Sequence, residues 1–103
     1  MQPIIIVSTF PSKQSITKIS NQIVRKNLAA CVNIVKISSV YAWKGKIENQ
    51  PEYLALFKTT QKNESNLKKE LIKLHPYDVP EIAKINVSSM NKPYLNWLID
   101  STN

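Results

Sequence analysis

The longest strand-like segment, residues 31–43, constrains the fold of this chain more than any other feature. Its side chains alternate in character as those of a strand do, and its prominent β-branched and aromatic residues include Val32, Ile34, Ile37, Val40 and Tyr41. Strands usually have about 5–6 residues, so we expect this one to be bent or bulged and to project beyond its sheet. Gly45, the only glycine, can supply the positive φ of a connecting turn. Residues 52–60 then return as the partner strand.

The start of the chain predicts one strand and one helix. Residues 3–10 include a continuous apolar run of the kind that is buried on both faces of a sheet, and Pro11 ends it. Ser12 or Ser15 can cap the helix that follows. That helix has one apolar stripe, formed by Ile16, Ile19, Ile23 and Val24.

The later part of the chain predicts two further helices with a strand between them. Residues 63–74 form the first of these helices, which Pro76 ends, and its apolar stripe is Leu67, Leu71 and Leu74. Residues 82–88 form the strand. Asn91 can cap the last helix, which begins near Pro93 and whose inward-facing residues are Tyr94, Leu95, Leu98 and Ile99.

This order of elements, β-α-β-β-α-β-α, predicts one α+β domain over residues 1–103. All but the last element match the ferredoxin-like split βαβ pattern, an antiparallel sheet with helices on one face. Because the strands carry apolar side chains on both faces, the face without helices would be left bare. We therefore expect neighbouring subunits to cover it.

The charge balance favours acidic partners only weakly. The chain has 14 Lys and Arg against 7 Asp and Glu, a formal net charge of +7, which favours phosphorylated small molecules and nucleic acid as partners. The basic residues are scattered, however, and Arg25 is the only arginine, the residue on which sequence-specific nucleic-acid readers depend. A nucleic-acid partner is therefore the weakest of our hypotheses. Binding driven by charge alone would be sequence-independent and would fade with salt.

The cysteine count and the first residues of the sequence indicate the cytosol. Cys31 is the only cysteine, so no disulfide within the chain is possible, which suits a reducing compartment. No basic residue precedes the apolar run at Ile4–Val7. This run is shorter than the about 7–15 apolar residues of a secretory signal or the about 20 of a membrane span. We expect a cytoplasmic protein that does not enter a membrane.

The loop at residues 75–81 concentrates the side chains that can take part in chemistry. It holds the only histidine, His75, together with two prolines that stiffen it, Tyr77, and the carboxylates of Asp78 and Glu81. Stiff loops of this kind suit the presentation of ligand-binding groups. Alternatively, His75 only caps the end of the preceding helix.

Two further residues have both a functional and a plain structural interpretation. Cys31 can act with His75 as a soft metal ligand, or it is a small buried hydrophobe. Trp43, beside the expected hairpin turn, marks an interface or packs in the core. The sequence encodes no local zinc motif, Cys31 has no activating neighbour, and one glycine cannot form a phosphate loop. We expect a binding protein and not an enzyme.

Five blocks of the sequence, in order and spanning nearly the whole chain, resemble the CutA family of small trimeric divalent-cation tolerance proteins. The blocks are KNLAACVN at 26–33, YAWKGKIE at 41–48, FKTT at 57–60, HPYDVPEI at 75–82 and YLNWL at 94–98. The resemblance implies a ferredoxin-like fold close to that of the PII signalling proteins, and a tight homotrimer whose long hairpin strands pair between subunits. It also implies that clefts between subunits are surrounded by Cys31, Trp43, Lys58, His75, Tyr77 and Glu81.

The association of this family with divalent metals, notably copper, makes a divalent metal ion the implied cofactor. His75 would be the metal ligand, with Cys31 and Glu81 as helpers. Two positions depart from the family members reported to bind copper. Ser8 stands where a cysteine can occur, and Leu74 stands where a second histidine can precede His75. Both are poorer ligands, which weakens the case for copper.

The leading hypothesis is a homotrimer that binds a metal ion or a small anionic ligand in three equivalent clefts between subunits. In this hypothesis His75 lies nearest the metal, Lys58 complements the ligand's charge, and Tyr77 and Trp43 form the walls. The alternative is a scaffold or interaction protein, in which these residues only hold the trimer together.

Overall fold

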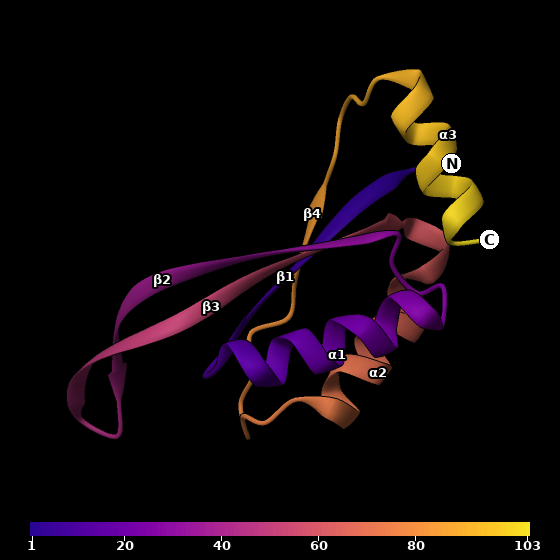
Figure 1. Cartoon of the computed structure of the whole chain (residues 1–103). Coiled ribbons are helices and arrows are strands. Elements are labelled where there is room, and N and C mark those ends of the chain that lie inside the picture. Colours follow the sequence, from indigo (N-terminus) through magenta and orange to yellow (C-terminus); the bar gives the residue numbers. More distant parts are fainter.

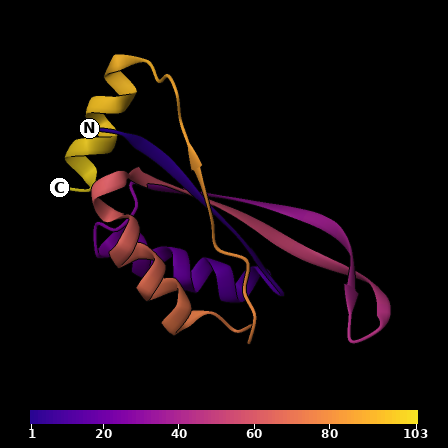
Figure 2. The same cartoon turned by 180° about the vertical axis from the view of Figure 1, so that it is seen from behind.

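The structure, a computed structural model, describes all 103 residues and has the predicted order of strands and helices (Figure 1). The elements are β1 (Pro3–Phe10), α1 (Lys13–Arg25), β2 (Cys31–Trp43), β3 (Lys46–Thr60), the short 3-10 helix η1 (Gln61–Asn63), α2 (Glu64–Leu74), β4 (Ala83–Asn86) and α3 (Lys92–Ser101). The strands form one antiparallel sheet in the order β2-β3-β1-β4. Helices α1 and α2 both lie on one side of it (Figure 1 and Figure 2), which confirms the predicted fold class.

The helices begin close to the positions that the sequence predicts. Ser12 caps α1, because its Oγ accepts a hydrogen bond from the backbone N–H of Ser15 at 3.1 Å. Helix α2 starts at Glu64, one residue later than predicted, because η1 comes first. Asn91 occupies the N-cap position of α3, and Pro93 lies in its first turn. Strand β4 is shorter than the predicted 82–88.

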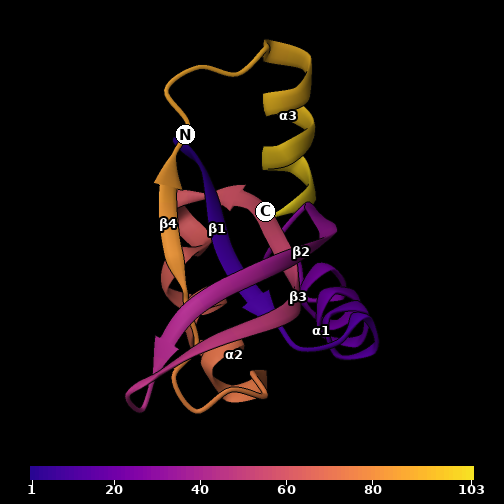
Figure 3. The ribbon, with the colours of Figure 1, turned by 90° about the vertical axis from the view of Figure 1, so that its left-hand side faces the viewer.

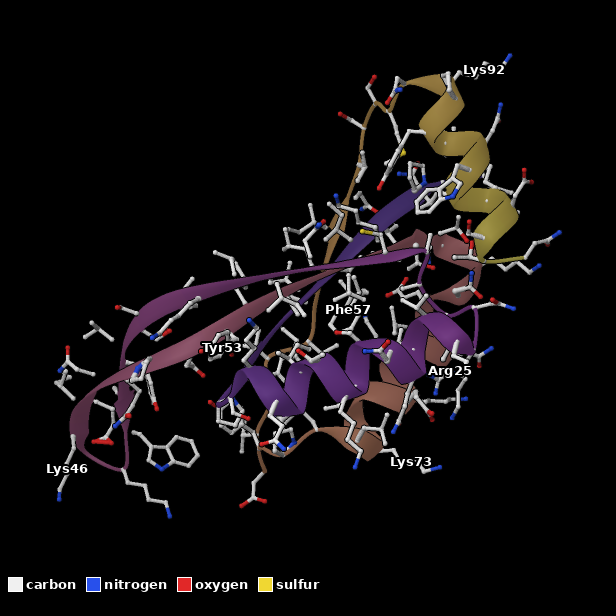
Figure 4. All side chains as sticks on the ribbon, in the orientation of Figure 1. Arg25, Lys46, Tyr53, Phe57, Lys73 and Lys92 are labelled. Atoms are coloured by element: carbon white, nitrogen blue, oxygen red, sulfur yellow. The ribbon has the colours of Figure 1, made fainter.

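The core lies between the sheet and the two helices α1 and α2. Alternate residues of β1 point into it and are almost fully buried, namely Ile4, Ile6, Ser8 and Phe10. Figure 4 shows Phe57 of β3 between the sheet and α1. Most of the predicted stripe of α1 is buried here, but Val24 stays 40% exposed. It is turned about 80° around the helix from Ile16, so it lies at the rim of the buried face.

Strands β2 and β3 form one long hairpin that curves away from the rest of the sheet (Figure 2). Every residue of β2 is paired in one uninterrupted register, so the bulge that was one of the two predicted distortions is absent. Strand β3 begins at Lys46 and not at residue 52, because the turn aligns the intervening polar residues with β2 whatever their own strand propensity. Lys44 and Gly45 in this turn both have positive φ, 50° and 78°, as in a type I′ turn.

The hairpin makes the molecule elongated, with dimensions of 45 × 25 × 21 Å (Figure 1). Figure 3 views the molecule from the side of the hairpin tip. In Figure 4 its tip, marked by Lys46, lies at the opposite end of the molecule from Lys92 at the start of α3. The outer part of the hairpin is therefore covered by no helix of its own chain, as the length of the segment predicted.

The sheet face opposite α1 and α2 is apolar and largely bare. Val35 of β2 and Ile85 of β4 point to this face and are each 50% exposed. Helix α3 lies at the end of the sheet that holds the N-terminus of the chain (Figure 1). The bare face agrees with the expectation from the sequence. None of the helices is both long and apolar enough to cross a lipid bilayer.

Candidate functional site

His75 lies where α2 ends and the loop to β4 begins. Its backbone N–H donates a hydrogen bond to the carbonyl of Leu71 at 2.8 Å, so it caps α2. Its side chain turns away from the helix and stacks on Phe10 at the end of β1, with ring centroids 4.2 Å apart and planes 18° apart. His75 therefore fills the predicted cap role through its backbone and leaves its ring for another role.

Both nitrogens of the His75 ring have partners. Ser8 Oγ donates to the carbonyl of Glu81 at 2.6 Å and lies 3.0 Å from His75 Nε2. Because the hydroxyl proton of Ser8 is used in this way, Nε2 must carry the proton that Ser8 Oγ accepts. His75 Nδ1 accepts from the backbone N–H of Tyr77 at 3.2 Å. Burial lowers the pKa of His75, so the ring is neutral and holds β1 to the loop.

Tyr77 forms the second contact between this loop and the sheet. Its hydroxyl donates a hydrogen bond to Glu52 Oε2 of β3 at 2.6 Å. Glu52 is only 7% exposed. Burial, and then the hydrogen bond to Glu52, raise the pKa of Tyr77 above its ordinary value. The pair is thus a neutral phenol that donates to a buried carboxyl group.

Between this loop and the hairpin lies a groove with a volume of about 780 Å³. We call it the loop–hairpin groove. Three of the five residues predicted to form a ligand cleft line it, namely Trp43, Tyr77 and Glu81. The residues that the sequence analysis did not single out for this site include Tyr41 and Glu52. His75 lies beside the groove, one residue before the wall formed by Pro76 and Tyr77.

Lys58 and Cys31 lie outside this groove. They face each other across β3 and β2, and the Lys58 ammonium lies 5.9 Å from the ring centroid of Tyr94 in α3. Cys31 is partly buried. Tyr53 of β3 pairs with Phe10, the residue on which His75 stacks. Lys58 lies five residues further along β3, which at 3.3 Å per residue places it about 16 Å from Tyr53. The chain does not bring Cys31 or Lys58 to His75.

No group of three His, Cys, Asp or Glu side chains in the chain is arranged to hold a metal ion. His75, the predicted metal ligand, has no free ring nitrogen, because Ser8 Oγ and the backbone N–H of Tyr77 are its partners. The residues of a single chain therefore do not fit a divalent metal.

Glu52 is the most informative residue of the groove that the sequence analysis missed. A signal for it exists, because Glu52 shares one face of β3 with Leu54 and Leu56 at a spacing of two. A carboxylate in line with apolar residues of one strand face indicates a buried charge, and such charges are paired or functional. Its partner Tyr77 is 25 residues away in the sequence, and no local pattern connects the two.

Comparisons with known proteins agree on one family. The model of the CutA1 divalent ion tolerance protein family matches residues 4–101. The divalent-cation tolerance protein CutA of Thermotoga maritima is 42% identical over 98 residues, which is 95% of this chain and 97% of that protein. The CutA protein of Pyrococcus horikoshii is 40% identical over 99 residues, 96% of this chain and 97% of that protein. A crystal structure of CutA1 from Pyrococcus horikoshii superposes with a TM-score of 0.94 at 39% identity, covering 97% and 98% of the two chains.

The fold defines a ferredoxin-like α+β domain with a long projecting hairpin. The chain belongs to the CutA1 divalent ion tolerance family, which confirms the predicted resemblance. The names of its relatives refer to tolerance of divalent cations and not to a reaction.

Proposed function

We propose that this protein is a cytoplasmic homotrimer that binds a small ligand in three grooves bordered by neighbouring subunits, without catalysis of its own. The observation that carries the proposal is the loop–hairpin groove. Its volume of about 780 Å³ falls in the range of about 300–1,000 Å³ that is typical of small-molecule sites. Trp43, Tyr77 and Glu81 line it, and the hydrogen bonds of His75 hold the loop in place.

Two features of the chain support an assembly of several copies, and the family resemblance implies that the number is three. The bare sheet face exposes apolar side chains such as Val35 and Ile85, and patches of this kind mark contacts between proteins. The hairpin also presents an unpaired β2 edge, which proteins normally cover. A closed ring of three copies would cover most of both features and place one loop–hairpin groove at each of its three subunit borders.

A divalent metal ion is the ligand that the names of the relatives suggest. Because one chain offers no set of three donors, a metal ion, copper included, would need donors from two subunits or the release of His75 from Ser8. His75, Cys31 and Glu81 are therefore metal-ligand candidates only after one of these two changes. A small organic ligand needs no such rearrangement, and the groove supports it better.

Thermal unfolding tests this function with a matched pair of variants. Trp43 and Trp97 are 46% and 45% exposed, but only Trp43 lines the groove. We expect at least one member of a panel of divalent ions, nucleotides and small organic ions to raise the unfolding midpoint of the wild type. A ligand at 100-fold over its dissociation constant adds about 2.7 kcal/mol. Trp43→Ala should lose this shift, and Trp97→Ala should keep it.

The scaffold hypothesis predicts a different pattern. A stable trimer whose midpoint no compound changes, and whose stability falls in His75→Ala, would show that the loop only holds the structure together. Equal ligand shifts in Trp43→Ala and the wild type would move the binding site away from the groove.

A further inference from the structure

The loop–hairpin groove has a charge opposite to that of the rest of the chain. The protein has 14 Lys and Arg against 7 Asp and Glu. Three of these carboxylates line the groove, Glu52, Asp78 and Glu81, whereas no lysine or arginine does. Lys58, the predicted partner of an anionic ligand, lies outside it. A groove of this composition attracts cations and repels anions.

Glu52 has no counter-charge in the chain. It is 7% exposed, and its only hydrogen-bond partner is the Tyr77 hydroxyl on Oε2. The ion pairs of the chain all involve Glu64 or Glu70, so Glu52 Oε1 is left to the groove. A buried carboxylate without a cation is costly, and a cation that entered the groove would reduce that cost.

The aromatic residues of the groove also suit a cation. Tyr41, Trp43 and Tyr77 line it, and aromatic faces attract ammonium groups within about 6 Å. The ring of Trp43 already has one such contact, with the Lys44 ammonium at 5.7 Å. The remaining lining is largely apolar, with Leu54 as one example, and suits methylene groups.

The positions of the carboxylates distinguish between kinds of cation. Glu52, Asp78 and Glu81 line one groove but do not converge into a cluster that could hold a metal ion. Carboxylates that are spread along an apolar and aromatic groove match a ligand whose positive charges are separated by hydrocarbon. A single divalent ion would contact too few of them.

We propose that the loop–hairpin groove binds a small aliphatic polyamine, a linear chain that carries two or more ammonium groups. The proposal rests on the ligand-binding function proposed above and names its ligand class. Glu52 accepts one ammonium group at the buried end of the groove, and Asp78 and Glu81 accept others nearer solvent. Trp43 and Tyr77 cover the methylene chain between them.

Tryptophan fluorescence of the assembled protein tests this proposal. In Trp97→Phe, Trp43 is the only one left of the two tryptophans, so the emission reports on the groove. We expect spermidine and 1,4-diaminobutane to change this emission with saturation. The uncharged 1,4-butanediol, which has the same carbon chain as the diamine, should leave it unchanged.

Two charge variants locate the binding. Glu52→Gln in the same background should lower the affinity for spermidine at least about tenfold, the change that 1.4 kcal/mol produces. Asp100→Asn removes the same unit of charge from an exposed position of α3 that does not line the groove. It should leave the affinity within a factor of about two, because distant exposed charges are screened by salt.

Each result has one meaning. Equal responses to 1,4-diaminobutane and 1,4-butanediol, or a Glu52→Gln affinity equal to the wild type, would overturn the proposal. If amines have no effect while a metal ion or a nucleotide still raises the unfolding midpoint, the polyamine proposal is wrong and the proposed binding function stands. If Glu52→Gln dissociates the trimer and amines have no effect, a neighbouring subunit supplies the counter-charge and the proposal is wrong. A trimer that responds to no compound would contradict both proposals.

Discussion

The ring of His75 connects the loop after α2 to β1 because each of its nitrogens has a partner. Nε2 pairs with Ser8, Nδ1 accepts from Tyr77, and the ring stacks on Phe10. These contacts require the neutral ring, since protonated Nδ1 could not accept a hydrogen bond. Burial accordingly lowers the pKa of His75.

The stability of the protein should therefore fall in mild acid. Because the folded state lowers the pKa of His75 below its ordinary value of 6.5, the unfolded chain binds the proton more readily. The free energy of unfolding then declines as the pH drops below about 6.5 toward the folded pKa. Urea unfolding between pH 7.5 and 5.5 should show this decline, with a slope below the about 1.4 kcal/mol per pH unit that one proton per chain permits.

His75→Gln provides the control, because His75 is the only histidine. The variant should lose most of the decline over this pH range. The hydrogen bonds to Lys68, Gln61 and Lys84 lower the pKa of Glu64 from 4.5 to about 2. The contribution of this carboxylate to stability is therefore lost only below about pH 4.5, outside the pH range in which His75 acts. A decline in His75→Gln as steep as that of the wild type would contradict the neutral-ring account.

Among the elements, the hairpin shows what local pattern can and cannot predict. The alternation of β2 predicts its full length, because the strand's own residues favour it. The first residues of β3 include Asn49, Gln50 and Pro51, which no strand propensity favours. They are paired because the Lys44–Gly45 turn fixes the register. The same limit applies to the site: the pattern finds the loop at 75–81, but the contact of Tyr77 with Glu52 depends on the folded chain.

Substitutions in this turn should change stability in opposite directions. At Gly45 an added Cβ would meet no atom within 4 Å, so Gly45→Ala carries only the backbone penalty of a left-handed residue, about 1–2 kcal/mol. Lys44 has a positive φ without being glycine, and asparagine accepts that region more readily. We expect urea unfolding to show a loss for Gly45→Ala and a gain below about 1 kcal/mol for Lys44→Asn. A neutral Gly45→Ala would contradict the backbone penalty expected from the positive φ of Gly45.

For the whole molecule, the bare sheet face and the projecting hairpin are the features that one chain leaves unsatisfied. A chain of 103 residues buries only somewhat more than about 60% of its unfolded surface. Further burial between subunits would supply stability that its small core lacks. The sequence predicted the bare face because its strands carry apolar side chains on both faces, whereas the number of copies that cover it is implied only by the family.

A pair of valines tests the role of this face. Val35 lies on the bare face and is 50% exposed, and Val24 lies on α1 and is 40% exposed. Val35→Asp should dissociate the assembly, because it would place an unpaired charge in the apolar contact. Val24→Asp should leave the assembly intact. Sedimentation at equal protein concentration measures both, and an intact Val35→Asp assembly would place the subunit contact elsewhere.

Native mass spectrometry of the protein with a metal ion, a nucleotide or spermidine added in turn tests the central claim most directly, because it counts chains and bound ligands together. We expect a trimer of about 35 kDa, three times the 11.8 kDa of one chain, that takes up no more than three copies of at least one compound. This uptake should be lost in Trp43→Ala and kept in Trp97→Ala. A monomer, or a trimer that binds none of the compounds with saturation, would contradict the claim that this protein is an assembled ligand-binding protein.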